Sequence, residues 1–339
     1  MGVKLTELLI KHKVSFEELK SKIIVIDAPV FLYQFLSTIR QPDGKPFTDS
    51  KGRITSHLMG LFTRTINFLN KGIKPVFVFE GKSPELKHRI QKLRAAQKEE
   101  ALKLYEEAVE KGLIEEARKY ASRISKLSPE MIQESKELLS ALGIPWIDAP
   151  SEAEAQASFM VKKGDCFAIA SQDEDSLMFG APKLIMNLSV TGRKKIQNKV
   201  LYEKVEPEII LLDENLNNLG IDHEQLIVLC ILIGTDYNPG GVSGIGPKRA
   251  LELVRKYGKN FDQIFKNVSW DFDFSWQEVF ETIKNIPVTE NYKLNWHEIN
   301  LDKTLKILLE HDFSEQRTRK LLEPLVKKQS QKDLKSFFG

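Results

Sequence analysis

Short apolar runs alternate with longer amphipathic segments along this chain. Three runs predict buried β-strands, at residues 22–27, 74–80 and 166–171. Segments with helical spacing of their apolar positions occur between and after them, at residues 31–39, 55–69 and 133–142. Strands that alternate with helices in this order predict an α/β fold with a doubly wound, mainly parallel sheet flanked by helices.

Further elements follow from the same pattern. We expect helices at residues 5–13 and 301–327, a strand at residues 183–186 and an exposed loop at the turn-rich residues 41–53. Residues 86–126 contain no proline and are dense in Lys, Arg, Glu and Ala, with one break at Gly112. This composition predicts two long charged helices.

Acidic residues stand at the carboxyl ends of four apolar segments, and a further pair opens the helix before the third strand. The seven carboxylates are those of Asp27, Glu80, Glu152, Glu154, Asp173, Asp175 and Asp236. Open α/β sheets place their chemistry beyond the carboxyl ends of their strands. We therefore expect these side chains to converge on one site.

Seven like charges in one place repel one another unless cations neutralise them. Ligand sets made only of oxygen favour Mg²⁺ or Mn²⁺ over zinc. The acidic residues therefore predict a divalent-metal site of the kind that hydrolyses phosphodiesters. In such a site two ions roughly 3.5–4 Å apart activate water and stabilise the leaving oxygen.

Each acidic pair also has a plain structural explanation. Ser151 and Glu154 fit a capping box, so the glutamate pair alone does not decide between a helix cap and a site. Asp173 and Asp175 alone would fit an exposed polar loop. The repetition of acids at the ends of several segments is what favours the metal site.

A glycine-rich segment, GGVSGIGPKRA at residues 240–250, is the second informative motif. Glycine lets a backbone approach a ligand closely, and Pro247 suits the first position of a helix whose free amides attract an anion. A tight helix–helix turn is the alternative. The combination favours a hairpin that grips the phosphates of duplex DNA without reading sequence, through Gly241, Gly244, Gly246, Lys248 and Arg249.

Lys87 and Arg94 lie seven residues apart, so they share one face of the first predicted charged helix. A solvated helical hairpin laced with salt bridges explains most charges of this region. The hairpin starts directly after an acidic strand end, however. We therefore hypothesise that Lys87 and Arg94 contact a phosphate at the site.

The bulk composition narrows the classes of protein. The chain has 339 residues, of which 42% are hydrophobic and 29% charged, as in a globular protein with a sizeable core. The net charge of +3 is too small to argue for nucleic-acid binding by itself. Cys166 and Cys230 lie in apolar runs and are expected to be buried thiols. No membrane-spanning run, P-loop, H-E-x-x-H or paired C-x-x-C motif occurs.

Three segments carry weaker signals. Residues 270–276 (WDFDFSW) are expected to pack under a loop, and the basic residues 189–202 are expected to form a hairpin at a solvated edge. Gln331, Leu334, Phe337 and Phe338 have the spacing of a short peptide that binds in a partner's groove. The alternative is a tail folded back on its own core.

Four motifs together resemble the flap endonucleases, members of the structure-specific 5′-nuclease superfamily. They are TSHLMGLF at residues 55–62, APSEAEA at 149–155, QDEDSLMFG at 172–180 and IGTDYNPGGVSGIGPKRA at 233–250. The terminal QKDLKSFF resembles the family's motif for the ring-shaped sliding clamp, proliferating cell nuclear antigen. The chain ends there without a long basic tail, as in the archaeal branch, which would place it in the cytoplasm with the nucleoid.

The resemblance implies a fold crossed by a helical arch, with a helix–two-turn–helix element that grips duplex DNA and holds a monovalent cation. It implies cutting of 5′ flaps at the junction with duplex and 5′–3′ exonuclease activity, in Okazaki-fragment maturation and DNA repair. It also implies two Mg²⁺ ions, replaceable by Mn²⁺, on the seven carboxylates. The remaining implied contacts are Lys87 and Arg94 with the scissile phosphate, Gly2, Tyr33, Arg40 and Arg64 with DNA, and the tail with the clamp.

The expected regions run consecutively along the chain. They are a nuclease region at residues 1–98, arch and linker at 99–130 with the arch beginning near 86, a nuclease region at 131–258 with the helix–two-turn–helix at 226–258, a helical region at 259–328 and the clamp-binding tail at 329–339. We expect a monomer without membrane contact.

This chain departs from the family's pattern at one acid. Glu80 stands where the family typically has aspartate, and the extra methylene moves the carboxylate by more than about an ångström, which metal geometry does not tolerate well. Because Glu can still bind Mg²⁺, we expect weakened or shifted catalysis and not its loss. Two alternatives stay open: a sister nuclease that acts on bubbles, nicks or four-way junctions, and a non-catalytic junction binder recruited to the clamp.

Overall fold

The computed structural model describes residues 3–41, 44–90, 107, 127–188, 194–195, 202–203 and 206–337. Two compact units interleave along the sequence. The first unit contains Met1–Asp27, Val78–Arg94 and Asp148–Glu290, and the second contains Ala28–Phe77, Ala95–Ile147 and Asn291–Gly339. The consecutive regions expected from the sequence stay a prediction.

Parallel strands form the centre of the large sheet. In the first unit, β2 (Ile23–Asp27) pairs in parallel with β5 (Ala168–Ala170), and β5 pairs in parallel with β6 (Lys183–Met186). The short β9 (Glu208–Leu211) runs antiparallel to β6, and β1 (His12–Lys13) runs antiparallel to β9. With β3 (Lys74–Phe79) and β4 (Trp146–Asp148), the strand order is β1-β9-β6-β5-β2-β3-β4. The predicted mainly parallel α/β sheet is confirmed.

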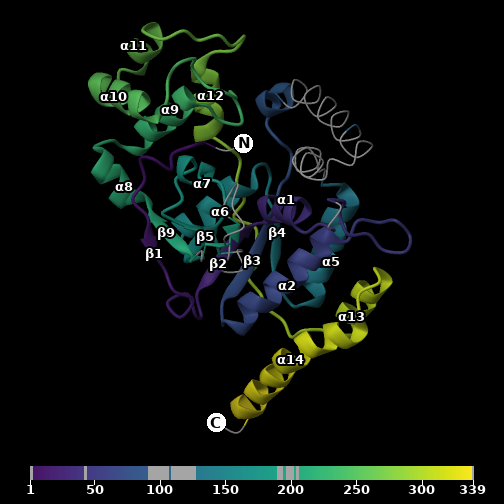
Figure 1. Ribbon diagram of the computed structural model, residues 1–339. Coiled ribbons are helices and arrows are strands. Elements are labelled where there is room, and N and C mark those ends of the chain that lie inside the picture. Colours follow the sequence, from purple (N-terminus) through teal and green to yellow (C-terminus); the bar gives the residue numbers. More distant parts are fainter. Residues whose placement is uncertain are drawn as a thin grey trace. The chain divides into compact units, whose positions relative to one another are not determined.

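The central strands are short and almost wholly apolar because both faces of the sheet are covered. All three residues of β5 are inaccessible to solvent, and helix α6 (Ala153–Lys162) packs on β2 and β5 (Figure 1). The one-turn helix α7 (Asp175–Met178) follows β5 directly and contacts α6. The carboxyl end of β5 therefore leads to Asp173 and Asp175, two of the predicted metal ligands.

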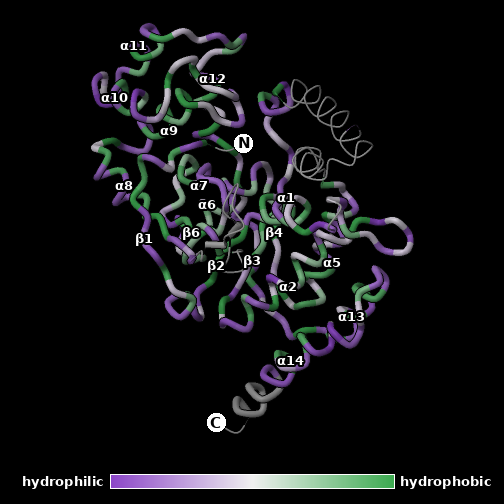
Figure 2. Tube along the Cα trace, in the orientation of Figure 1, coloured by the Kyte–Doolittle hydropathy of each residue, from purple (hydrophilic) through white to green (hydrophobic). Residues whose placement is uncertain are grey.

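Five helices follow β9 in the described part of the first unit. They are α8 (Leu212–Leu219), α9 (His223–Ile233), α10 (Pro247–Tyr257), α11 (Phe261–Lys266) and α12 (Trp276–Lys284). A capping box at Asp222 and Gln225 starts α9, whose residues 226–232 are all buried. Helix α10 packs on α9 and carries mostly hydrophilic residues (Figure 2).

Besides most of β3 and β4, the regular elements in the described part of the second unit are helices. They are α1 (Ala28–Thr38), α2 (Ser56–Asn70), α5 (Pro129–Ala141), α13 (Leu301–Glu310) and α14 (Glu315–Phe337). Helix α2 packs against α1 and α5. The single helix expected at residues 301–327 is two helices, because the chain turns at His311 and Asp312, where Asp312 has φ +60°.

The helix expected at residues 5–13 is wrong. Residues 6–8 form a turn and His12–Lys13 is strand β1. The backbone amides of this segment bond to distant side chains instead of to a helix: Leu5 N donates to Glu174 and Ile10 N donates to Asn215. Tertiary partners thus replaced the local hydrogen bonds that a helix needs.

Other expectations fall partly outside the described residues. Residues 85–90 are helical, and the rest of the predicted charged hairpin lies outside the described range except for residue 107. The basic segment contributes strands β7 (Lys194–Lys195) and β8 (Tyr202–Glu203), which pair antiparallel. The expected aromatic packing at residues 270–276 is confirmed, because Phe265 stacks on Trp276 with centroids 4.5 Å apart and meets Trp270 edge-on.

In the described part of the chain, no single helix is long and apolar enough to cross a membrane, although the bent pair α8 and α9 passes by length and composition. Cys166 and Cys230 are buried free thiols, as expected.

Candidate active site

The seven predicted carboxylates all belong to the first unit. Asp27 is the last residue of β2 and is only 1% exposed, while Asp173 and Asp175 follow β5. Glu80 comes directly after β3, and Asp236 follows the end of α9. Because the parallel strands β2 and β5 end at the same edge of the sheet, Asp27, Asp173 and Asp175 lie on a common edge.

The capping-box explanation of the glutamate pair is wrong. Glu152, not Ser151, is the N-cap residue of α6, and its side chain makes no capping hydrogen bond. The hydroxyl of Ser151 is buried without a partner. The carboxylates of Glu152 and Glu154 are therefore free of helix capping and are directed elsewhere.

Lys87 joins three of the acids. Its ammonium nitrogen lies 2.6 Å from Glu152 Oε2, 3.0 Å from Glu80 Oε1 and 3.8 Å from Asp236 Oδ2. Burial alone would lower the pKa of Lys87, but the negative charges of Glu152, Glu80 and Asp236 raise it above its ordinary value. Lys87 is therefore a permanent cation inside the acidic cluster, as the sequence hypothesis required of a phosphate-binding residue.

Burial opposes ionisation of the acids themselves. It raises the pKa of Glu152 to about 7, against the opposing charge of Lys87 and with that of Glu80. Burial also raises the pKa of Glu154 well above its ordinary value, and the charges of Asp175, Asp27 and Asp173 add to the effect. Glu154 is thus within electrostatic reach of three further predicted ligands.

Asp175 connects two groups of acids. The first group, Glu80, Glu152 and Asp236, surrounds Lys87, and the second consists of Glu154, Asp27 and Asp173. Burial raises the pKa of Asp175 to about 7, the Val3 amide that donates to it lowers the pKa, and the charges of Asp236 and Asp173 raise it. Asp173 likewise has a raised pKa, because of burial first and then of Asp236 and Glu174. All seven predicted carboxylates are therefore electrostatically linked, because Asp236 lies near Lys87 and its charge also acts on Asp173 and Asp175.

The donor set fits a hard divalent cation. It consists of carboxylate oxygens, and the buried Glu152 Oε1 and Glu154 Oε1 accept no hydrogen bond from the protein. Within the described residues, no group of three His, Cys, Asp or Glu side chains already has the geometry to hold a metal ion. Lys87 stands among three of the acids instead and neutralises part of their charge.

The glycine-rich segment forms the predicted hairpin between α9 and α10. Gly234 and Gly241 have φ +105° and +60°, and a Cβ on Gly241 would lie 2.4 Å from the carbonyl oxygen of Leu232. Pro247 is the first residue of α10 and Gly246 its N-cap, without a capping side chain. Lys248 and Arg249 are exposed beside the open helix N-terminus, which suits a phosphate.

Other predicted contact residues belong to the second unit. Tyr33 is 41% exposed on α1, and burial lowers the pKa of Arg64. Arg40 donates to the carbonyls of Ser37 and Gly44 and so braces the loop that follows α1. Gly2, Arg94 and Phe338 lie outside the described residues, and Gln331, Leu334 and Phe337 lie in the last turns of α14, whose side chains are not described.

Sequence reasoning missed two residues of this region. Tyr237 is 2% exposed, and burial together with the charges of Glu152 and Glu154 raises its pKa. Glu174 is 3% exposed and bonds to residues near the N-terminus. Glu174 lies in the motif QDEDSLMFG at residues 172–180. Its hydrogen-bond partners are more than 160 positions away in the sequence, so no local pattern reveals them.

Known proteins resemble this chain over nearly its full length. The model of the XPG N-terminal domain matches residues 1–101, and that of the XPG I-region matches residues 143–236. Flap endonuclease 1 of Staphylothermus marinus is 51% identical over 333 residues, which cover 96% of this chain and 95% of that protein. Among solved structures, flap endonuclease-1 from Methanococcus jannaschii has a TM-score of 0.76 and 42% identity, with coverage of 97% and 100%.

A more distant solved structure, the catalytic core of Rad2 in complex with a DNA substrate, has a TM-score of 0.70 and 26% identity. The match covers 94% of this chain and 96% of that one. The likeness therefore spans both units and both parts of the sequence that carry the acids.

Proposed function

This chain belongs to the flap endonuclease 1 family, and on that premise we propose that it cuts DNA bearing a 5′ flap at the junction of flap and duplex in a reaction that requires divalent metal ions. The observation that carries the proposal is the set of seven electrostatically linked carboxylates, most of them buried or half-buried, of which Glu80, Glu152 and Asp236 surround Lys87. Repulsion among so many like charges destabilises a folded protein unless cations bind there.

We propose that Asp27, Glu80, Glu152, Glu154, Asp173, Asp175 and Asp236 hold two Mg²⁺ ions, some through water. Bound Mg²⁺ would supply an activated water and would neutralise the leaving oxygen. When bound cations neutralise the carboxylates, the ammonium group of Lys87 would be available to place a positive charge beside the scissile phosphate. Arg94 is proposed to act with it, on the spacing of the two residues.

The hairpin between α9 and α10 is proposed to hold the duplex. Its open helix N-terminus and the exposed Lys248 and Arg249 suit one phosphate of the backbone, and its glycines leave room for the strand. Such contacts position the junction and read no sequence. The Rad2 core, which resembles this chain, is a complex with a DNA substrate, and this supports DNA as the ligand.

The proposed partner of the C-terminal tail is the sliding clamp. Helix α14 extends to Phe337, so Gln331, Leu334 and Phe337 lie along its last turns. A pull-down on an archaeal clamp with the full chain and with the Phe337→Ala, Phe338→Ala double variant tests this contact. Equal capture of both proteins contradicts it.

The decisive test of the nuclease uses a 5′-labelled double-flap DNA with Mg²⁺, with EDTA, and with the Asp175→Ala variant. We expect one product cut at the junction, lost in EDTA and in Asp175→Ala, and retained in the matched control Asp213→Ala, whose carboxylate is exposed on α8. Binding without cutting in both Mg²⁺ and Mn²⁺ would instead favour the non-catalytic junction binder. Preference for a bubble or a four-way junction in the same assay would favour a sister nuclease.

A further inference from the structure

We propose that Glu174 is a positioning residue that anchors the N-terminal segment Val3, Leu5, Thr6 and Lys11 at the acidic edge of the sheet and thereby orients the carboxylate of Asp175. The inference rests on the proposed function, because it names what holds one of the proposed metal ligands in place.

Glu174 makes three contacts with this segment. Its Oε2 accepts a hydrogen bond from the backbone N–H of Leu5 at 2.7 Å. Its Oε1 accepts from the Thr6 hydroxyl at 2.8 Å and from the Lys11 ammonium at 3.1 Å. The carboxylate is only 3% exposed, so a charge and two further donors compensate its desolvation.

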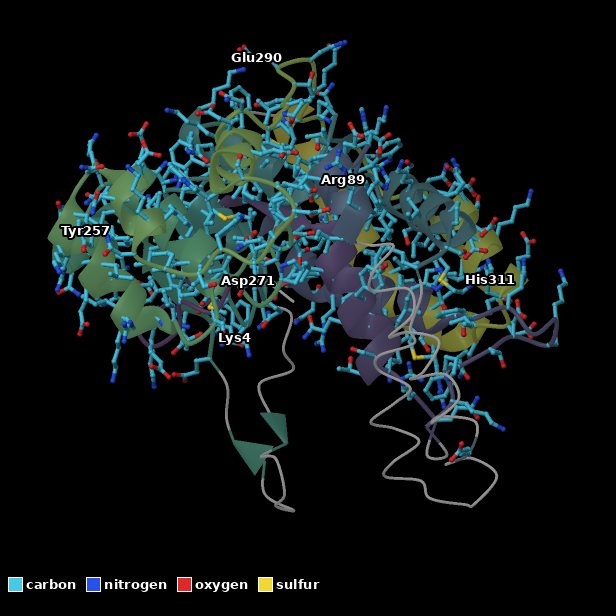
Figure 3. All side chains as sticks on the ribbon, turned by 90° about the horizontal axis from the view of Figure 1, so that it is seen from above. Lys4, Arg89, Tyr257, Asp271, Glu290 and His311 are labelled. Atoms are coloured by element: carbon cyan, nitrogen blue, oxygen red, sulfur yellow. The ribbon has the colours of Figure 1, made fainter. Side chains whose placement is uncertain are left out.

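The neighbouring acid receives the next amide of the same segment. The backbone N–H of Val3 donates to Oδ1 of Asp175. Val3 and Leu5 are 4% and 0% exposed, while Lys4 between them, labelled in Figure 3, is exposed. The extended segment thus presents alternate amides, at positions 3 and 5, to the consecutive acids Asp175 and Glu174.

The consecutive acids Glu174 and Asp175 have different roles in this arrangement. Glu174 is committed to protein donors on both of its oxygens, so it holds structure and does not serve as a ligand. Asp175 has one oxygen fixed by Val3, which restricts rotation of its carboxylate. Residues that fix the orientation of a metal-binding carboxylate change metal affinity when they are altered.

The local chain depends on this anchor because it has little regular structure of its own. Residues 3–5 are in neither helix nor strand, and residues 6–8 form a turn with Leu8 N donating to Leu5 O at 2.8 Å. The ionic contact from Lys11 to Glu174 then ties the far end of the segment, just before β1, to the same carboxylate.

The test replaces Glu174 by Gln, which keeps the size of the side chain and removes its charge. We expect faster hydrogen exchange at the amides of Val3 and Leu5, and Mn²⁺ affinity weakened about tenfold in calorimetric titration without DNA. We also expect a single-turnover cleavage rate lowered about tenfold, with the Kd for flap DNA within about twofold of the unaltered protein. Lys4→Met, on the exposed neighbour, should leave all four quantities unchanged.

Lys11→Met removes only one of the three contacts of Glu174, together with the weak contact of Lys11 with Met186 Sδ. It should shift exchange, Mn²⁺ affinity and rate in the same direction by less, which keeps the test valid if Glu174→Gln folds poorly. Faster exchange in the variants with unaltered Mn²⁺ affinity and rate overturns the proposal, as does unaltered exchange. Failure of the unaltered protein to bind Mn²⁺ and to cut the flap is a different result: it overturns the proposed function, and the positioning role with it.

Discussion

The positive charge of Lys87 offsets part of the negative charge of the acidic cluster. Its ammonium group contacts Glu80 and Glu152 at 3.0 and 2.6 Å, and the three nearby acids hold its pKa above the ordinary value. A cation in this position has two uses. It relieves repulsion among the acids before metal ions bind, and it offers positive charge to a phosphate that approaches afterwards.

Replacing Lys87 by Met should lower the single-turnover rate by about 100-fold or more, because a charge that stabilises the reacting phosphate is lost. The Kd for flap DNA should change by less than about threefold, since one contact among many phosphate contacts is removed. Quench-flow cleavage and fluorescence anisotropy measure the two. Lys82→Met, an exposed lysine of the same segment, is the control, and an equal loss in both variants contradicts the role of Lys87.

Glu80 is the second residue whose chemistry decides the rate. Its side chain reaches Lys87, and it stands where aspartate is typical of the flap endonucleases. Glu80→Asp should raise the cleavage rate at saturating Mg²⁺, because the shorter carboxylate releases Lys87 and restores the usual distance to the metal. Glu85→Asp, the same change on a glutamate 88% exposed, should leave the rate unaltered. No gain in Glu80→Asp would show that the extra methylene is harmless.

At the scale of elements, the hairpin between α9 and α10 requires glycine for two different reasons. Gly241 has φ +60° and no room for a Cβ, since Leu232 O would lie at 2.4 Å. Gly244 has φ +74°, but nothing lies within 4 Å of its Cβ position. The first glycine is therefore required by packing within the hairpin, and the second only by its backbone conformation and by any ligand that approaches.

Alanine at these two positions tests the two reasons separately. Gly244→Ala should destabilise the protein by about 1 kcal/mol, the cost of a positive φ, and should weaken binding of a plain DNA duplex. Gly241→Ala should destabilise it by clearly more than Gly244→Ala, because backbone atoms must also move. Thermal unfolding and duplex titrations provide both numbers. Equal destabilisation by the two variants would argue that the contacts of Gly241 do not matter.

At the scale of the whole molecule, the acidic site makes stability depend on pH and on cations. Burial raises the pKa of Glu152 and of Asp175 to about 7, whereas both groups titrate near about pH 4 in an unfolded chain. The folded state therefore binds more protons in this window. The stability that these groups contribute is fully present below about pH 4 and is lost as the pH rises through about 7.

Without divalent cations, the Tm should therefore decline as the pH rises from about 5 to about 8. Saturating Mg²⁺ should raise the Tm more at the upper end of this range, because it binds the ionised carboxylates of the folded state only. Calorimetry in EDTA and in Mg²⁺ at several pH values measures both effects. Asp175→Asn should flatten the pH dependence, and a Tm in EDTA that rises across this range would refute the linkage.

The sequence alone determined the parallel α/β sheet, the acids at its edge and the glycine-rich hairpin. These features follow from local rules: apolar runs such as residues 22–27 form buried strands, strands that alternate with helices run parallel, and Pro247 after Gly246 starts a helix. Each signal lies within a dozen neighbouring residues. The seven candidate ligands could be named for this reason, because every one of them stands within about three residues of the start or end of an element.

Only the tertiary structure decided what those acids contact. Residues 5–13 look helical by themselves, yet their amides bond to Glu174 and Asn215. Ser151 and Glu154 look like a capping box, yet Glu152 takes the N-cap position and bonds to Lys87. Partners that lie 65 to 205 positions apart outweigh local preferences, because a buried charge or amide gains more from a partner than a short segment gains from its own helix.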